Sequence, residues 1–246
     1  MTDSDPAVTD SDVHYASRGS THFDVLLALF AVVLVVSNIA ATKGIEFGAG
    51  SFSIGSLQIL PIVTDGGAFL FPLAYILGDV ISEVYGFKAA RRAIFTGFAM
   101  ALLAALTFLV VQHAPPASFY ENQGAFETVL GFVPQIVAAS LAGYLAGQFL
   151  NSFVLVRMKA RTSEPHLFAR LATSTGVGEL ADTFIFCAIA ATAIGIDSMG
   201  TFWNYFLVGF IYKTAVEFLV MPLTMTVIAW LKRREPTYWG ADARPV

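Results

Sequence analysis

Residues 167–195 read LFARLATSTGVGELADTFIFCAIAATAIG, an apolar run of helical length that contains two acids, Glu179 and Asp182. These acids are three residues apart, so they share one face of a helix. Charge is costly in hydrocarbon, so acids in a spanning helix usually face the interior of a bundle or a watery cavity. The stretch therefore predicts a membrane helix whose acidic face points toward whatever the protein binds or moves.

Long apolar runs of this kind fill the rest of the chain. Six of them lie at roughly 23–42, 62–85, 91–112, 131–157, 167–194 and 203–231. A bilayer core takes about 20 helical residues, and helices satisfy their own backbone in lipid. The chain is 56% hydrophobic and only 13% charged, about half the charged share of soluble proteins. The runs do not alternate as barrel strands do, so we expect an all-α, polytopic protein with six transmembrane helices.

The basic residues predict how these helices are oriented. If six helices alternate, twelve of the fourteen lysines and arginines fall on one side: Arg18, Lys88, Arg91, Arg92, Arg157, Lys159, Arg161, Arg170, Lys232, Arg233, Arg234 and Arg244. The positive-inside rule then places both termini in the cytoplasm.

Three segments follow from the same reading. Residues 1–20 are acidic and lack an apolar core, so we expect a disordered tail and no cleavable signal. Residues 21–234 form the six-helix transmembrane domain, and residues 235–246 form a cytoplasmic tail. The Gly- and Ser-rich linker at 43–61 is predicted to hold a short re-entrant or interfacial piece, and a polar loop follows residue 111.

The second run carries Asp79 and Glu83, four residues apart and therefore on one helix face. Two carboxylates in this arrangement repel unless one is protonated or a cation lies between them. They suit a binding site. Their position near the cytoplasmic end equally allows pairing with Lys88, Arg91 or Arg92.

The last two runs combine acids with one lysine. Glu179 and Asp182 suit substrate contact, and they can also form an interhelical ion pair with Lys213. Glu217 lies four residues after Lys213 and can pair with it instead. Five acids thus face one lysine, and the excess invites protons, a cationic ligand or arginines that reach in from the cytoplasmic edge. These acids are Asp79, Glu83, Glu179, Asp182 and Glu217.

Carboxamides mark the first and fourth runs. Asn38 lies in the first run, and Gln148 and Asn151 lie in the fourth. A carboxamide donates and accepts together, which suits the edge of a heterocycle, although such groups also join helices. Gly143 and Gly147 form a GxxxG pattern that can pack helices within one chain or between two, so a homo-oligomer stays possible.

Signatures of soluble enzymes are missing from the sequence. It contains no phosphate-binding loop, no HExxH and no GxSxG. Cys187 is the single cysteine and the four histidines are scattered, so no metal-ligand spacing is present. We therefore expect no enzyme activity, no cofactor and no metal site.

Four ordered motifs carry a family resemblance. They are SNIAATK at 37–43, GGAFLFPLAYILGDVISEVYGFKAARRAIF at 66–95, STGVGELADTFIF at 174–186 and YKTAVEFLVMPLTMTVIAWLKR at 212–233. Together they resemble the queuosine precursor transporter family, also called the vitamin uptake transporter family, over roughly residues 23–234. The resemblance implies uptake of 7-deazaguanine bases, the cyano compound preQ0 and the aminomethyl compound preQ1, across the inner (cytoplasmic) membrane of a prokaryote.

The resemblance also implies functional residues. The family's Ser-Asn pair falls on a motif that includes Asn38, its helix-two aspartate on Asp79, its Asp-Thr pair on a motif that includes Asp182, and its lysine on Lys213. Glu179 departs from the family pattern, in which a carboxamide is common at that place.

A guanine-like ring offers a ring N–H beside an exocyclic amine, and one carboxylate can accept both. We expect Asp182 and Glu179 to bind this edge, with the other groups completing the cavity. The predicted substrate-binding residues are Asp182, Glu179, Asp79, Lys213, Asn38, Gln148, Asn151 and Glu83.

Other functions fit the same residues. One is a substrate-capture subunit that needs a separate ATPase and coupling protein. Others are a membrane enzyme that acts on a lipid or nucleobase, and a proton or cation channel. Within the transporter hypothesis the partners are the small 7-deazaguanine substrate and the lipid bilayer, with no nucleic acid. The choice among preQ0, preQ1 and queuine stays open, as does the driving force.

Overall fold

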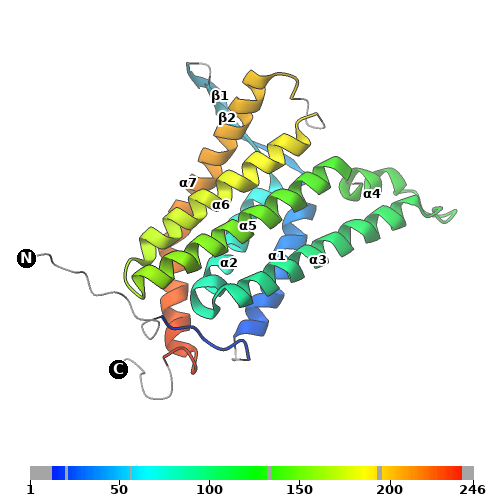
Figure 1. Cartoon of the computed structure of the whole chain (residues 1–246). Helices are drawn as coiled ribbons and strands as arrows, with labels where there is room; N and C mark the ends of the chain where they lie inside the picture. Colours follow the sequence, from blue (N-terminus) through cyan, green and yellow to red (C-terminus); the bar gives the residue numbers. More distant parts are fainter. Residues whose placement is uncertain (1–12, 20–21, 56, 132–133, 193–195, 240–246) are drawn as a thin grey trace, which may run out of the picture.

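The structure, a computed structural model, describes residues 13–19, 22–55, 57–131, 134–192 and 196–239. Within these ranges it has seven α-helices, one short 3-10 helix and one two-stranded sheet (Figure 1). The elements are α1 Phe23–Ala40, β1 Gly44–Ile54, β2 Leu57–Asp65, η2 Gly66–Phe69, α2 Phe71–Tyr85, α3 Phe87–His113, α4 Gln123–Leu130, α5 Pro134–Thr162, α6 Leu167–Ala190 and α7 Met199–Arg234.

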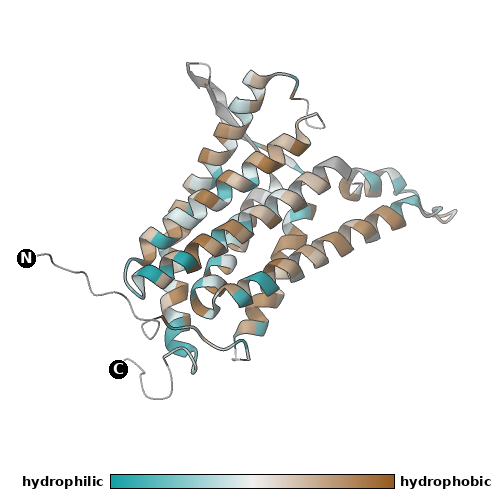
Figure 2. Ribbon diagram, viewed as in Figure 1, coloured by the Kyte–Doolittle hydropathy of each residue, from teal (hydrophilic) through white to brown (hydrophobic). Residues whose placement is uncertain are grey.

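Helix α2 is the centre of the bundle. It contacts α1, α3, α5 and α7, and every residue from Ala74 to Tyr85 is buried. Helices α5 and α6 lie against each other along their lengths, and α7 packs on α6. Beyond its first turns, the ribbon of α3 is coloured mainly brown in Figure 2, so hydrophobic residues make up most of this helix. The buried side chains of α2 therefore lie among those of α1, α3, α5 and α7.

Four helices of the described part are long and apolar enough to cross a bilayer. They are α1, α3, α5 from Val137 onward, and α7. Helix α2 has only 15 residues, fewer than the roughly 20 that a bilayer core requires, and α6 carries buried charges. The predicted helical architecture is confirmed, four of the helices are candidate membrane spans, and the six membrane crossings stay a prediction.

The segment from Gly44 to Phe69 differs from the prediction. The expected linker forms an antiparallel hairpin in which Gly44 pairs with Asp65, and a helix beginning at residue 62 is wrong. Helix α2 begins at Phe71 because Pro72 lies in its first turn, where the missing N–H is not needed. The predicted polar loop after α3 also contains a short helix, α4.

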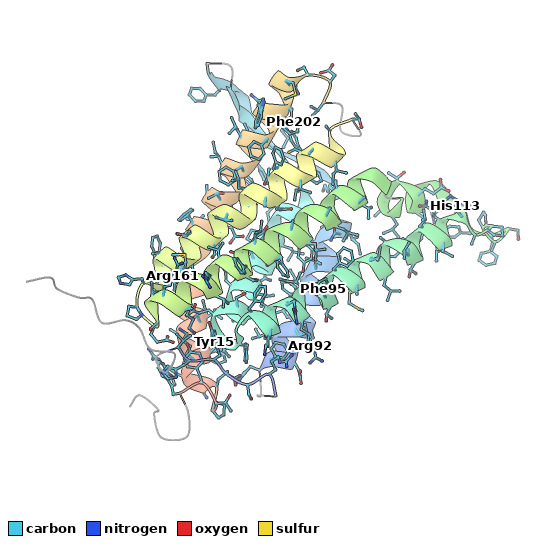
Figure 3. The ribbon with its side chains drawn as sticks, in the orientation of Figure 1. Tyr15, Arg92, Phe95, His113, Arg161 and Phe202 are labelled. Carbon is cyan, nitrogen blue, oxygen red and sulfur yellow. The ribbon has the colours of Figure 1, made fainter. Side chains whose placement is uncertain are left out.

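The first and last helices meet at one end of the bundle. His22 Nδ1 lies 2.8 Å from Glu235 Oε1, and α3 and α6 begin at the same end, where α2 and α5 finish. We call this the basic end. Tyr15, Arg92 and Arg161 mark it in Figure 3, far from His113 and Phe202. Eleven of the twelve basic residues predicted to share one side belong to segments at this end, and Arg244 lies outside the described residues.

The predicted N-terminal tail, residues 1–20, lies mostly outside the described residues. The described part, residues 13–19, contacts the basic end: Ala16 N–H donates to the Val84 carbonyl at 2.8 Å. The C-terminal segment is described to Trp239, and Glu235 and Tyr238 in it are buried. Both segments therefore pack against the helices where they are described.

Candidate functional site

A cluster of polar side chains lies between α2, α5, α6 and α7, about midway along α6. We call it the central cluster. Lys213 Nζ of α7 donates to Asp182 Oδ2 of α6 at 2.8 Å and lies 3.7 Å from Glu179 Oε2. The side chains of Asp182 and Glu179 are only 6% and 3% exposed. The predicted ion pair with Lys213 is therefore present, and it holds both acids.

Small residues on α5 and α6 make room for this cluster. A Cβ on Gly147 would lie 2.7 Å from Asp182 Cβ, and a Cβ on Gly178 would lie 2.8 Å from Asn151 Cβ. A Cβ on Gly143 would meet Asp182 Oδ1 at 2.5 Å. Neither a methyl group nor a longer side chain fits at these positions, so the GxxxG pattern packs α5 on α6 within one chain.

Helix α2 brings two further groups to the cluster. The Tyr75 hydroxyl donates to Asp182 Oδ2 at 3.5 Å, and Asp79 Oδ1 accepts from Asn151 Nδ2 at 2.7 Å. Both contacts join α2 to a neighbouring helix. Because α2 is buried along its length, these groups face protein and not lipid.

Several buried polar atoms of the cluster have no hydrogen-bond partner within the described part of the chain. They include both carboxamide atoms of Gln148, the Asn151 Oδ1 atom, the Glu179 Oε2 atom and the Thr175 hydroxyl. Gln148 and Asn151 are fully buried. Buried polar groups in folded proteins are nearly always hydrogen-bonded, so these donors and acceptors without partners set the cluster apart from the rest of the bundle.

Glu83 belongs to a second cluster at the basic end. Its carboxylate accepts from Arg170 Nη2 and from Lys232 Nζ, both at 2.8 Å, and lies 3.5 Å from Lys159 Nζ. These three cations replace the pairing with Lys88, Arg91 or Arg92 that the sequence also allowed. The sequence suggested that protons, a cationic ligand or an arginine from the edge of the bundle could balance the excess acids. For Glu83, Arg170 is such an arginine. The predicted role of Glu83 in substrate binding stays a prediction.

The second cluster, which we call the basic-end network, continues into the loop after α5 and the C-terminal segment. Glu164 accepts from Lys232 at 2.5 Å and from the Tyr238 hydroxyl at 2.7 Å. Nearby, the Tyr85 hydroxyl donates to Glu235 at 2.7 Å. The sequence reading missed this network. In the sequence, the network is indicated only by several basic residues near predicted helix ends and by the acid Glu83 within an apolar run.

Electrostatics outside the spanning helices agrees with a compact network. Burial alone would raise the pKa of Glu164, but Lys159 and the bonds from Lys232 and Tyr238 outweigh it, so its pKa lies below the ordinary value. Burial, followed by the nearby charge of Glu83, raises the pKa of the Tyr15 hydroxyl to about 12. Glu164 is therefore ionised and Tyr15 neutral at physiological pH.

Asn38 lies apart from the central cluster. Its carboxamide donates to the Leu34 carbonyl of its own helix at 2.8 Å. It lines a cavity of about 310 Å³ enclosed by α1, α3, α4 and α5. None of the other predicted site residues lines this cavity. This cavity is thus separate from the polar cluster, and its walls are mainly apolar.

The structure therefore brings together six of the eight predicted residues: Asp79, Gln148, Asn151, Glu179, Asp182 and Lys213. Chemically, the cluster offers carboxylates that accept N–H groups and carboxamides that both donate and accept. Among the described residues, no group of His, Cys, Asp and Glu could hold a metal ion.

Comparisons with known proteins point in one direction. Residues 65–227 match the family described as "Putative vitamin uptake transporter". The chain is 29% identical over 170 residues to a protein of Bacillus subtilis (strain 168) named "Probable queuosine precursor transporter", covering 69% of this chain and 73% of that protein. It is also 29% identical over 180 residues to the "Queuosine precursor transporter" of Escherichia coli (strain K12), covering 72% and 79%. No solved structure matches the chain.

Proposed function

Because the chain belongs to the vitamin uptake transporter family, we propose that it imports queuosine precursors, the 7-deazaguanine bases preQ0 and preQ1, across the cytoplasmic membrane. The relatives from B. subtilis and E. coli carry names of queuosine precursor transporters. They support this reading over an enzyme, and nothing in them favours a substrate-capture subunit.

The observation that carries the proposal is the set of bare polar atoms in the central cluster. A guanine-like ring presents a carbonyl oxygen, a ring N–H and an exocyclic amine along one edge. The carboxylates of Asp182 and Glu179 can accept the two N–H groups, and the carboxamides of Gln148 and Asn151 can hydrogen-bond the rest of the ring. The substrate would satisfy atoms that the protein alone leaves without partners.

Lys213 has a distinct role in this proposal. It neutralises Asp182 while no substrate is present, and this lowers the cost of a buried carboxylate. A substrate that offers two N–H groups to Asp182 competes with the ammonium for the same oxygens. We infer that Lys213 releases Asp182 as the base enters.

The proposed direction of transport follows from the basic end. Its arginines and lysines favour a cytoplasmic location, which would place the hairpin β1–β2 outside. The basic-end network is buried, and it closes that end of the bundle around Glu83. In this proposal the structure is closed toward the cytoplasm, and release of the base requires this end to open.

The test is rescue of queuosine in tRNA. Cells that cannot make the precursor are given nanomolar preQ0 or preQ1, with and without this gene. We expect gene-dependent modification, and the more effective base identifies the preferred substrate. Asp182→Asn should abolish rescue at an unchanged membrane level. Asp24→Asn, a change at an exposed acid of α1, should leave it intact.

Two outcomes would contradict the proposal. Equal tRNA modification with and without the gene would contradict the assignment of preQ0 and preQ1 as substrates. Normal rescue by Asp182→Asn would contradict the assignment of Asp182 to the binding site. Uptake by the purified protein alone in liposomes would further separate a complete transporter from a subunit that needs an ATPase.

A further inference from the structure

Glu217 is a buried acid that the proposed binding chemistry does not use. It lies on α7, one helical turn after Lys213, and is 5% exposed. Within the described part of the chain it has no hydrogen bond and no ion pair. The charged groups that act on it are Asp79 of α2, Glu179 of α6 and Lys213 of its own helix. It therefore faces the central cluster.

The charges around Glu217 disfavour its ionised form. The cluster holds four acids, Asp79, Glu179, Asp182 and Glu217, against the single lysine. Full ionisation would leave three negative charges in excess among these largely buried side chains. Lys213 is engaged by Asp182 at 2.8 Å. A buried carboxylate without a partner is far costlier than a neutral carboxyl, so burial without a partner favours the neutral form of Glu217.

A protonated carboxyl has a property that a carboxylate lacks: it donates a hydrogen bond. A guanine-like edge needs one such donor, for its carbonyl oxygen, beside acceptors for its two N–H groups. Glu179 and Asp182 supply the acceptors. The neutral Glu217 carboxyl can supply the donor, because it shares the cluster with Glu179.

We propose that Glu217 carries a proton that enters with the substrate, so that import is coupled to the proton gradient. The inference rests on the proposed function. One base and one proton bind from outside, and both leave to the cytoplasm: Glu217 becomes a carboxylate on release and takes up a new proton on the outer side. No other reactant is consumed.

Coupling of this kind is reciprocal. If only the protonated form donates to the carbonyl, protonation strengthens substrate binding, and substrate binding strengthens protonation by the same factor. Affinity then falls as pH rises, by at most about tenfold per pH unit for a single proton. A more acidic exterior loads the site, and a more alkaline cytoplasm unloads it.

The test uses purified protein in liposomes and two assays. Counterflow measures exchange of labelled preQ0 or preQ1 at equal pH, and concentrative uptake is measured with the outside more acidic by about one unit. We expect wild type to do both, and a protonophore to remove only the accumulation. Glu217→Gln keeps a donor without a titratable proton. It should lose pH-driven accumulation while exchange stays detectable at a reduced rate, and the exposed control Glu121→Gln should behave as wild type in both assays.

The outcomes separate the two proposals. Absence of counterflow by wild type overturns the proposed function. Counterflow without pH-driven accumulation overturns proton coupling alone. Accumulation by Glu217→Gln at the wild-type level removes Glu217 as the carrier, and loss of exchange in Glu217→Gln contradicts the requirement for a neutral donor.

Discussion

Replacement of Arg170 by methionine tests whether the basic-end network holds the bundle together. The Arg170 side chain is fully buried. It donates twice to Glu83, at 2.8 and 3.3 Å, and also to Thr162 Oγ1 at the end of α5 and to the Ser163 carbonyl just after it. Methionine keeps most of the apolar stem and removes every one of these donors, so the loss measured is electrostatic and not mainly one of packing.

The structure sets the size of the effect. Removing one partner of a buried ion pair costs about 3–5 kcal/mol. Glu83 keeps Lys232 at 2.8 Å and Lys159 at 3.5 Å, so the lower limit, about 3 kcal/mol, applies. For a chain of this size that corresponds to a fall in melting temperature of about 6–12 °C.

The chain carries its own reporter for the measurement. Cys187 is its single cysteine and is fully buried, so a thiol-reactive dye reacts only when the protein opens. Melting curves in detergent are compared for wild type, Arg170→Met and Arg91→Met, where Arg91 is exposed. We expect Arg91→Met to match wild type.

Equal melting temperatures for Arg170→Met and Arg91→Met would refute the reasoning. A second comparison sharpens it. Glu83→Gln combined with Arg170→Met should cost less than the sum of the single changes, because neither charge is then left alone. Strict additivity would show that the two side chains do not stabilise each other.

Three other predictions concern packing, polarity and pH. Gly147→Ala places a methyl group 2.7 Å from Asp182 Cβ and should abolish uptake. Gly176→Ala, with open space around it, should preserve uptake, and equal uptake by both would contradict the close packing. Gln148→Leu removes two bare polar atoms and should raise the melting temperature while uptake is lost; unchanged uptake would show that the carboxamide does not touch substrate. The pKa of Glu164 lies below its ordinary 4.5, so its stabilisation is present above that pH and is lost as pH falls through the folded value. Melting curves of Glu164→Gln should therefore show a smaller loss of stability on acidification than wild type, and equal losses would exclude this carboxylate as a source.

Hydrophobic run length predicted the main helices because it reports a strong, local preference. Five of the six predicted runs overlap α1, α3, α5, α6 and α7 along most of their length. The second run was placed too early, since apolar residues lie on both sides of the short TDGG stretch at 64–67, where β2 ends ahead of α2. Apolar content alone does not distinguish the strand from the helix there, and Pro72 lies in the first turn of α2.

The central cluster was predictable for a related reason. Glu179, Asp182 and Lys213 are charges within apolar runs, and such charges must meet inside a bundle. Both acids pair with Lys213 because it is the one lysine within the apolar runs of that region. Asn38 looked similar in sequence, but its donor is satisfied by its own helix at Leu34. A carboxamide carries no net charge that would force it to find a distant partner.

The partners of Glu83 could not be read from spacing. The nearest cations in sequence are Lys88 and Arg91, but a residue beyond the end of α2 belongs to α3, which begins after a sharp turn at Gly86 with φ of 77°. This turn directs α3 along its own path. The actual partners come from α5, α6 and α7, and their distance from Glu83 depends on how the whole bundle closes.

The wide sequence separation within the basic-end network has a consequence for biosynthesis. The three cations that contact Glu83 come much later in the chain: Lys159 lies 76 residues after it, Arg170 lies 87 residues after it, and Lys232 lies 149 residues after it. While α5, α6 and α7 are still being synthesised, α2 already carries this acid without all its counter-charges. The nascent chain reaches its final fold only when the last helix arrives, and a polypeptide stopped before α7 would present an incompletely neutralised carboxylate to the membrane proteases that remove unfinished proteins.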